Sequence, residues 1–221
     1  MEKKLLTLII ITLFLAEILI LQNQTLGFIL YSILILGTFL AISKSEKINN
    51  YFKILLILMT LPILRISQLF INFSVFWNTA VIYFLFFFLT CFYIFKFKIN
   101  PGFTKKYLYL LPLTILLGII LGFFSSQLAE KTPQILILLP IIAFSEEVLF
   151  RTIQVYLTKL YSPIAGILIP ALLFTIFSSL GIISISLLIS SIIIGIIYHY
   201  TKNIYLSISI NFMINFLAFA V

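Results

Sequence analysis

Long runs of apolar residues, separated by short polar segments, fill almost the whole chain. Each run is continuously apolar instead of alternating, which predicts helices and argues against a transmembrane β-barrel. A membrane-spanning helix needs about 20 residues, so the pattern predicts an all-α, polytopic integral membrane protein of about eight or nine transmembrane helices. The apolar runs lie at about 5–21, 27–43, 52–72, 76–95, 107–124, 134–157, 163–179, 182–200 and 203–220.

The composition supports lipid as the solvent for most of the surface. Hydrophobic residues make up 63% of the 221 residues and charged residues 9%, and the mean hydropathy is +1.27. A soluble domain has about one quarter charged residues, so this chain has too few to cover a globule of its size. The first run begins after Met1-Glu-Lys-Lys and ends at Gln22-Asn-Gln, without a small-residue cleavage site. We therefore expect a retained span and not a cleaved signal sequence.

The net charge of +8 does not indicate nucleic acid as a partner, because the lysines are scattered in short loops between apolar runs. Basic loops are typical of the cytoplasmic side of a membrane protein and of contact with anionic lipids. With nine spans and a cytoplasmic N-terminus, only Lys131 falls in an outer loop. Eight spans is the alternative. We expect an integral protein of the plasma membrane, with these lysines inside: Lys3, Lys4, Lys44, Lys47, Lys53, Lys96, Lys98, Lys105, Lys106, Lys159 and Lys202.

The basic stretch from Lys96 to Lys106 is the best internal boundary, because it contains Asn100-Pro101-Gly102 between two apolar runs. Such a segment is typical of a loop. We therefore divide the chain into N-terminal transmembrane helices, residues 1–100, and a C-terminal transmembrane core, residues 101–221.

Five ionisable residues lie inside the predicted spans and away from their ends: Glu17, Arg65, Glu146, Glu147 and Arg151. A charge at the bilayer centre costs about 2.5 to 3.5 kcal/mol on insertion scales, so each needs a partner, a water-filled cavity or a function. Glu17 and Arg65 lie at matching depth in the first and third spans, which predicts a structural ion pair. The alternative is a substrate or ion path.

The sequence Glu146-Glu147-Val-Leu-Phe150-Arg151 lies near the middle of the sixth predicted span. Glu147 and Arg151 are four residues apart with the acid first, which favours an ion pair on one helix face. Glu146 is rotated by about 100° from Glu147 and does not share that pair. The arrangement predicts one paired acid and one acid free to act as general acid or base. The alternative is a buried polar network that only holds helices together.

At this motif the sequence resembles the CPBP family of membrane proteins, the CAAX-protease and bacteriocin-processing proteins, also called Abi. The first motif of that family is Glu-Glu-x-x-x-Arg, present here from Glu146 to Arg151. The second, Phe-x-x-x-His, corresponds to Phe174-Thr-Ile-Phe-Ser178, so a serine replaces the histidine.

The resemblance covers about residues 106–221 and includes the last predicted helix. The family carries His-x-x-x-Asn there, and this chain has Asn211-Phe-Met-Ile-Asn215. The chain is identified as a divergent member that lacks both motif histidines. The resemblance implies an intramembrane glutamic endopeptidase that cleaves a prenylated or peptide substrate with an activated water. It implies Glu146 as the base, Glu147 and Arg151 as its supporting pair, Asn215 as a hydrogen-bond donor, and Ser178 and Asn211 in the two histidine positions.

The single histidine and single cysteine limit the chemistry. His199 and Asn203 repeat the His-x-x-x-Asn spacing, but His199 lies at a helix end near water, where we expect an interfacial side chain. A catalytic zinc needs about three protein ligands, and Cys91 has no second cysteine beside it. We therefore expect no metal and no cofactor.

The missing histidines leave the function open between two classes. Serine and asparagine form hydrogen bonds but do not exchange protons near neutral pH as imidazole does. One class is an endopeptidase acting on a membrane-embedded peptide or protein. The other is a non-catalytic relative, a binding, bacteriocin-immunity or membrane-complex assembly protein that holds such a peptide or a partner subunit. A transporter or channel is a third class.

Overall fold

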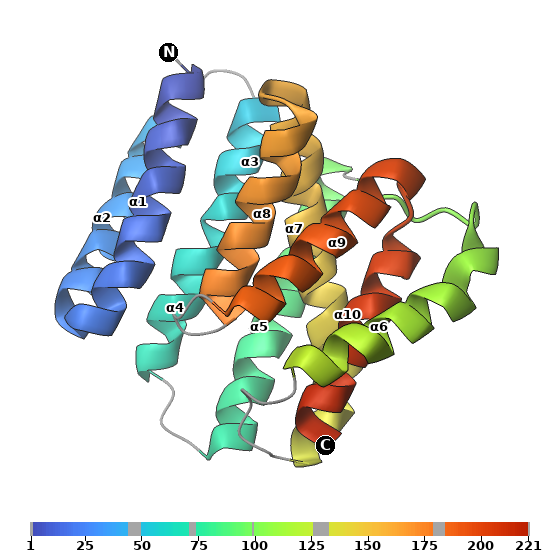
Figure 1. Ribbon diagram of the computed structural model, residues 1–221. Coiled ribbons are helices and arrows are strands. Elements are labelled where there is room, and N and C mark those ends of the chain that lie inside the picture. Colours follow the sequence, from blue (N-terminus) through green and yellow to red (C-terminus); the bar gives the residue numbers. More distant parts are fainter. Residues whose placement is uncertain are drawn as a thin grey trace.

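The computed structural model describes residues 2–43, 50–70, 74–98, 100–125, 133–178 and 184–220. These residues form helices and no strand (Figure 1), which confirms the all-α class. The α-helices are α1 (Glu2–Gln22), α2 (Gln24–Ser43), α3 (Asn50–Leu58), α4 (Thr60–Phe70), α5 (Val75–Phe97), α6 (Leu111–Ser125), α7 (Leu139–Leu160), α8 (Pro163–Ser178), α9 (Ile185–Thr201) and α10 (Ile204–Ala220). Two short 3₁₀ segments, η1 (Leu108–Leu110) and η3 (Pro133–Leu138), precede α6 and α7.

The described parts of the apolar runs are mainly helical, but the run at 52–72 forms two helices instead of one. Its described part divides at Met59 into α3 and α4. Pro62 explains the division, since proline has no N–H to donate to the carbonyl of Leu58 and its ring crowds that carbonyl. The helical hydrogen bonds of Met59 are still formed. Met59 N donates to Leu55 O, and Met59 O accepts from Ile63 N.

Helix α7 lies in the middle of the bundle. It contacts α3, α5, α8, α9 and α10, whereas the α1–α2 hairpin and α6 lie at opposite sides of the molecule in Figure 1. Residues of α5 and α10 therefore reach Glu146, near the centre of α7.

Two glycines let α6 approach α10 closely. A Cβ atom added at Gly118 would lie 2.7 Å from Met213 Cβ, and one at Gly122 would lie 2.8 Å from Leu217 Cδ1. Glycines four residues apart are the common device for close contact between membrane helices. The pair fixes α10, and with it Asn211 and Asn215, against the rest of the core.

The surface exposes many large apolar side chains, and the mainly apolar interior contains a few charged ones. The largest exposed fractions include Phe95 at 80% and Phe124 at 74%, whereas Glu146, Glu147 and Arg151 are at most 3% exposed. Soluble proteins bury their apolar side chains and keep most charges in water. An outer surface of this kind suits lipid, and an interior with paired charges is what a membrane bundle requires.

Two helices of the described chain are long and apolar enough to cross a membrane, over Lys3–Gln22 and Phe76–Phe97. Several other apolar helices, including Gln24–Leu40 and Pro163–Ser178, are shorter. The count of eight or nine spans therefore stays a prediction.

The basic segment near residue 100 is packed against the turn between α9 and α10. Asn203 Nδ2 donates to Thr104 O at 3.1 Å and also to Lys106 O. The carbonyl of Gly102 accepts from Ile204 N at 3.1 Å, and Gly102 has a φ of 95°, which glycine adopts without strain. The division of the chain at residue 100 stays a prediction. Side-chain hydrogen bonds from Arg65 to Phe177 and from Tyr83 to Glu146 cross this boundary.

Candidate active site

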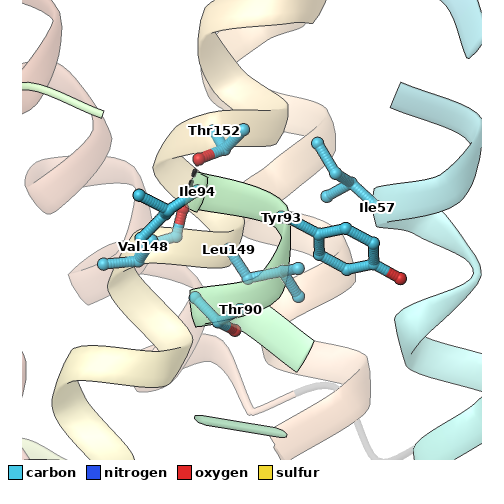
Figure 2. A pocket seen from close by; sticks show the side chains of 7 residues that line it. All are labelled: Ile57, Thr90, Tyr93, Ile94, Val148, Leu149 and Thr152. Carbon is cyan, nitrogen blue, oxygen red and sulfur yellow. Dashed lines mark hydrogen bonds between the residues drawn. The ribbon is translucent and has the colours of Figure 1, made fainter. Parts of the chain in front are cut away.

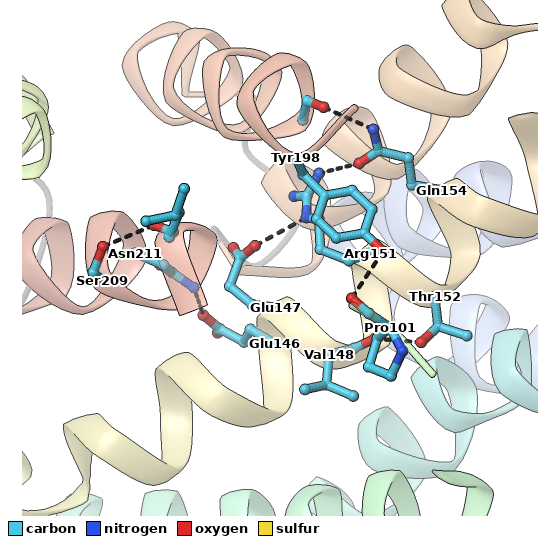
Figure 3. A network of polar contacts seen from close by, with 12 residues as sticks. Pro101, Glu146, Glu147, Val148, Arg151, Thr152, Gln154, Tyr198, Ser209 and Asn211 are labelled. Atoms are coloured by element: carbon cyan, nitrogen blue, oxygen red, sulfur yellow. Dashed lines mark hydrogen bonds and ion pairs between the residues drawn. The ribbon is translucent and has the colours of Figure 1, made fainter. Parts of the chain in front are cut away.

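The two acidic residues of α7 lie within a fully packed part of the helix. Glu146 is 3% exposed and Glu147 1%. The helix begins at Leu139 with a proline at its second position, where the missing N–H costs no intrahelical bond. Because α5, α8, α9 and α10 all pack on α7, both carboxyl groups are removed from bulk solvent and depend on protein partners (Figure 3).

Glu147 forms the ion pair that its spacing predicts. Arg151 Nε donates to Glu147 Oε2 at 2.9 Å, and both side chains are 1% exposed. Arg151 Nη1 donates to Gln154 Oε1 at 2.5 Å, and Gln154 Nε2 donates to Gly195 O on α9 at 2.7 Å. Figure 3 shows this chain of contacts from α7 to α9. The prediction of a Glu147–Arg151 pair is confirmed.

Glycine at position 195 makes this contact with α9 possible. A Cβ atom there would lie 3.1 Å from Arg151 Nη1 and 3.2 Å from Ile167 Cγ2. Both distances are shorter than ordinary carbon contacts, so a larger residue would move either α9 or the guanidinium.

Glu146 is held differently, by two neutral donors on opposite helices. Tyr83 Oη on α5 donates to Glu146 Oε1 at 2.8 Å. Asn211 Nδ2 on α10 donates to Glu146 Oε2 at 3.1 Å, and Asn215 Nδ2 donates to Asn211 Oδ1 at 3.0 Å. The second asparagine thus fixes which end of the first amide faces the carboxylate. No cation pairs with Glu146 among the described residues.

The other predicted site residue, Ser178, lies apart from this network. It is the last residue of α8 and its side chain is exposed. Within the described ranges, no hydrogen bond joins Ser178 to Glu146. The structure therefore brings together Glu146, Asn211 and Asn215, with Glu147 and Arg151 one step along the same helix, and leaves Ser178 outside.

His199 and Asn203 are engaged elsewhere. His199 lies in the last turn of α9, and its Nδ1 is 3.5 Å from Lys202 Nζ. Asn203 is buried and binds the backbone of the 104–106 segment. In the part of the chain that the structure describes, no three His, Cys, Asp or Glu side chains are grouped for a metal ion.

The second buried ion pair is also formed. Arg65 Nε on α4 donates to Glu17 Oε1 on α1 at 2.7 Å, and Tyr31 Oη on α2 donates to the same oxygen. Arg65 Nη2 reaches Phe177 O at the end of α8 at 2.5 Å. The predicted Glu17–Arg65 pair is confirmed, and it joins the first helices to α8.

Two cavities in the described structure have linings that do not include the site residues. A cavity of about 10 Å³ lies between α3, α5 and α7, about the space that one water molecule needs. Figure 2 shows the side chains that line it. Its lining comprises Ile57, Thr90, Tyr93, Ile94, Val148, Leu149 and Thr152. A larger, mainly apolar groove of about 480 Å³ lies between α6 and α10 and is lined by Leu108, Leu111, Ile115, Tyr205, Ile208, Ser209, Phe212 and Met213 as well as Lys105.

Sequence reasoning missed Tyr83 and Gln154. Gln154 follows Arg151 by three residues inside a predicted span, and that spacing predicts a contact between the two side chains on one helix face. Tyr83 stands in a run of aromatic residues on a different helix, and nothing local distinguishes it from its neighbours.

A comparison with models of known protein families matches residues 128–217 to the family described as type II CAAX prenyl endopeptidase Rce1-like. The match contains α7, α8 and α9 and most of α10, and therefore both acidic residues and both asparagines. Tyr83 lies outside it. No curated protein and no solved structure matches the chain.

Proposed function

Residues 128–217 form an Rce1-like domain of the CPBP family, and from this premise we propose that the protein is an intramembrane endopeptidase that uses Glu146 to activate water. The observation that carries the proposal is the different surroundings of two adjacent acids. Glu147 is neutralised by Arg151, whereas Glu146 is bound by neutral donors alone in the described chain. A carboxylate with no counterion keeps its capacity to accept a proton.

The proposed reaction is hydrolysis of a peptide bond. Each Glu146 oxygen accepts one hydrogen bond, and a carboxylate oxygen has a further lone pair for a water molecule. Water gives a proton to the carboxylate as its oxygen attacks the carbonyl carbon. The C–N bond then breaks, and the proton passes from Glu146 to the leaving amine.

The asparagines and the ion pair have separate proposed roles. Asn211 holds the second Glu146 oxygen, and Asn215 orients Asn211 while its second amide hydrogen is a donor for the oxyanion of the intermediate. Glu147 and Arg151 fix α7 against α9 through Gln154. Ser178 takes no step, because it does not touch the network within the described residues.

The substrate class follows from the location of the site. A base buried among apolar helices reaches only a peptide that enters the membrane. The α6–α10 groove is lined by Phe212, the residue that follows Asn211. We propose a membrane-embedded peptide or protein, prenylated or not, as the substrate. We further propose that the chain is polytopic in the plasma membrane, with its N-terminus in the cytoplasm. Reporter fusions in the loops test this topology.

Cleavage of a panel of membrane-anchored peptides by protein in lipid vesicles tests the proposed activity. The panel contains prenylated and unprenylated members of the same sequence. Glu146→Gln should lower the rate by about 10² to 10⁴, the usual contribution of a general base. Glu17→Gln combined with Arg65→Met is the control, because it changes another buried membrane carboxyl and removes its ion-pair partner with it. Equal loss in both variants would contradict the role of Glu146.

A specific observation favours a second candidate, a non-catalytic peptide-binding protein. Both histidine positions of the family hold other residues, and Ser178 does not contact the carboxylate in the described chain. Such a protein would serve in binding, immunity or assembly of a membrane complex. Peptide binding by wild type and Glu146→Gln alike, with no product from either, would select this candidate.

A further inference from the structure

Tyr83 belongs to a helix outside the Rce1-like domain, yet its hydroxyl binds the candidate base. It lies on α5, and its Oη donates to Glu146 Oε1 at 2.8 Å. The family match begins at residue 128, so this contact joins the domain to the N-terminal helices.

Aromatic contacts fix the position of Tyr83. Its ring stacks on Phe86 with centroids 6.1 Å apart. One turn along α5, Phe87 lies 5.5 Å from Phe144 of α7, two residues before Glu146. Both ends of the hydrogen bond are therefore held by helices that are packed on each other, and the hydroxyl has little freedom to leave the carboxylate.

The two donors on Glu146 act from opposite sides. Asn211 approaches from α10 and is itself oriented by Asn215, whereas Tyr83 approaches from α5. A carboxylate held by a single donor can rotate about its last bond. Two donors, one on each oxygen, fix the plane of the carboxylate and the direction of its remaining lone pairs.

We propose that Tyr83 is a positioning residue for Glu146, so that a helix outside the Rce1-like domain completes the active site. This inference rests on the proposed function. It assigns to Tyr83 no contact with the substrate or the water and no transferred proton. Its effect is to aim the base, and misplacement of a reacting group by about 1 Å can cost about 10²-fold in rate.

Two other tyrosines supply matched controls. Tyr93, also on α5, donates its hydroxyl to Leu56 O at 3.0 Å. Tyr31 donates to Glu17, a carboxylate that is already neutralised by Arg65. Tyr→Phe at the three positions removes the same oxygen from a helix-facing tyrosine, but only Tyr83→Phe frees Glu146.

Cleavage kinetics distinguish a positioning role from a structural one. Tyr83→Phe should lower kcat by about 10- to 100-fold, the value of a hydrogen bond to a charged group, with KM unchanged. Tyr93→Phe and Tyr31→Phe should keep the wild-type kcat. Tyr83→Phe should cause no further loss when added to Glu146→Gln, since the base it aims is gone. Equal kcat in wild type and Tyr83→Phe overturns the inference and leaves the proposed function intact.

Infrared difference spectroscopy tests the same contact without turnover. The carboxyl band that disappears in Glu146→Gln should shift in Tyr83→Phe and not in Tyr93→Phe. If wild type cleaves no peptide, the proposed function fails, and this band still decides whether Tyr83 holds the Glu146 carboxyl. A band that stays in place in Tyr83→Phe overturns the inference.

Discussion

Replacing Arg151 by methionine should destabilise the protein by an amount that the structure sets. Methionine is similar in length but has no donor, so Glu147 and Gln154 both lose a hydrogen bond inside the bundle. Removing one partner of a buried ion pair costs about 3 to 5 kcal/mol. We expect a loss at the lower end of this range. Arg151 Nη2 has no partner among the described residues, so the native protein already bears the cost of one buried donor without a hydrogen bond. At about 2 to 4 °C for each kcal/mol, a loss of about 3 kcal/mol lowers Tm by about 6 to 12 °C.

Thermal unfolding in a single detergent, followed by loss of soluble monomer, measures this effect. Lys159→Met is the control, because it removes a positive charge from an exposed position on the same helix and should change the free energy of unfolding by about 0.5 kcal/mol or less. Glu147→Gln combined with Arg151→Met removes both charges and should recover most of the loss. An unchanged Tm in Arg151→Met, or no recovery in the double variant, would refute the assignment of Arg151 to the charge of Glu147.

Three further predictions concern contacts between segments that are distant in the sequence. Gly195→Ala places a Cβ 3.1 Å from Arg151 Nη1 and should lower the free energy of unfolding by about 1 to 3 kcal/mol. The control Gly37→Ala, whose Cβ meets nothing within 4 Å, should raise it by about 0.5 to 1 kcal/mol. The Tm of each variant measures the effect. Gly118→Val should separate α6 from α10, since even a Cβ there lies 2.7 Å from Met213 Cβ, and a cysteine cross-link between the two helices should then form more slowly. Asn203→Ala should release the 104–106 segment, whose carbonyls it binds, and limited proteolysis should cut there faster than in wild type.

The helices and the local ion pair were accessible from sequence because they depend on near neighbours. Continuous apolar runs predicted helices, and an acid four residues before a base predicted the Glu147–Arg151 pair. The Glu17–Arg65 pair was predicted from the matching depth of the two residues, because an unpaired charge inside a membrane is costly.

Contacts between distant helices were not accessible. Tyr83 is one aromatic residue among many on α5, and only the packing of α5 on α7 brings it to Glu146. The motif spacing placed Ser178 at the right point along a helix, but spacing does not fix which way that helix end faces. Two local signals were overlooked: Pro62, which divides α3 from α4, and the glycine pair at 118 and 122.

The most direct test of the central claim is cleavage of a membrane-anchored peptide in ¹⁸O-labelled water, followed by mass spectrometry of the new carboxyl end. If Glu146 activates water, the wild-type product carries one ¹⁸O atom and Glu146→Gln forms almost no product. The control, Glu17→Gln combined with Arg65→Met, forms labelled product as wild type does. Labelled product formed equally by Glu146→Gln, or no product from the wild-type protein with any peptide of the panel, would contradict the claim.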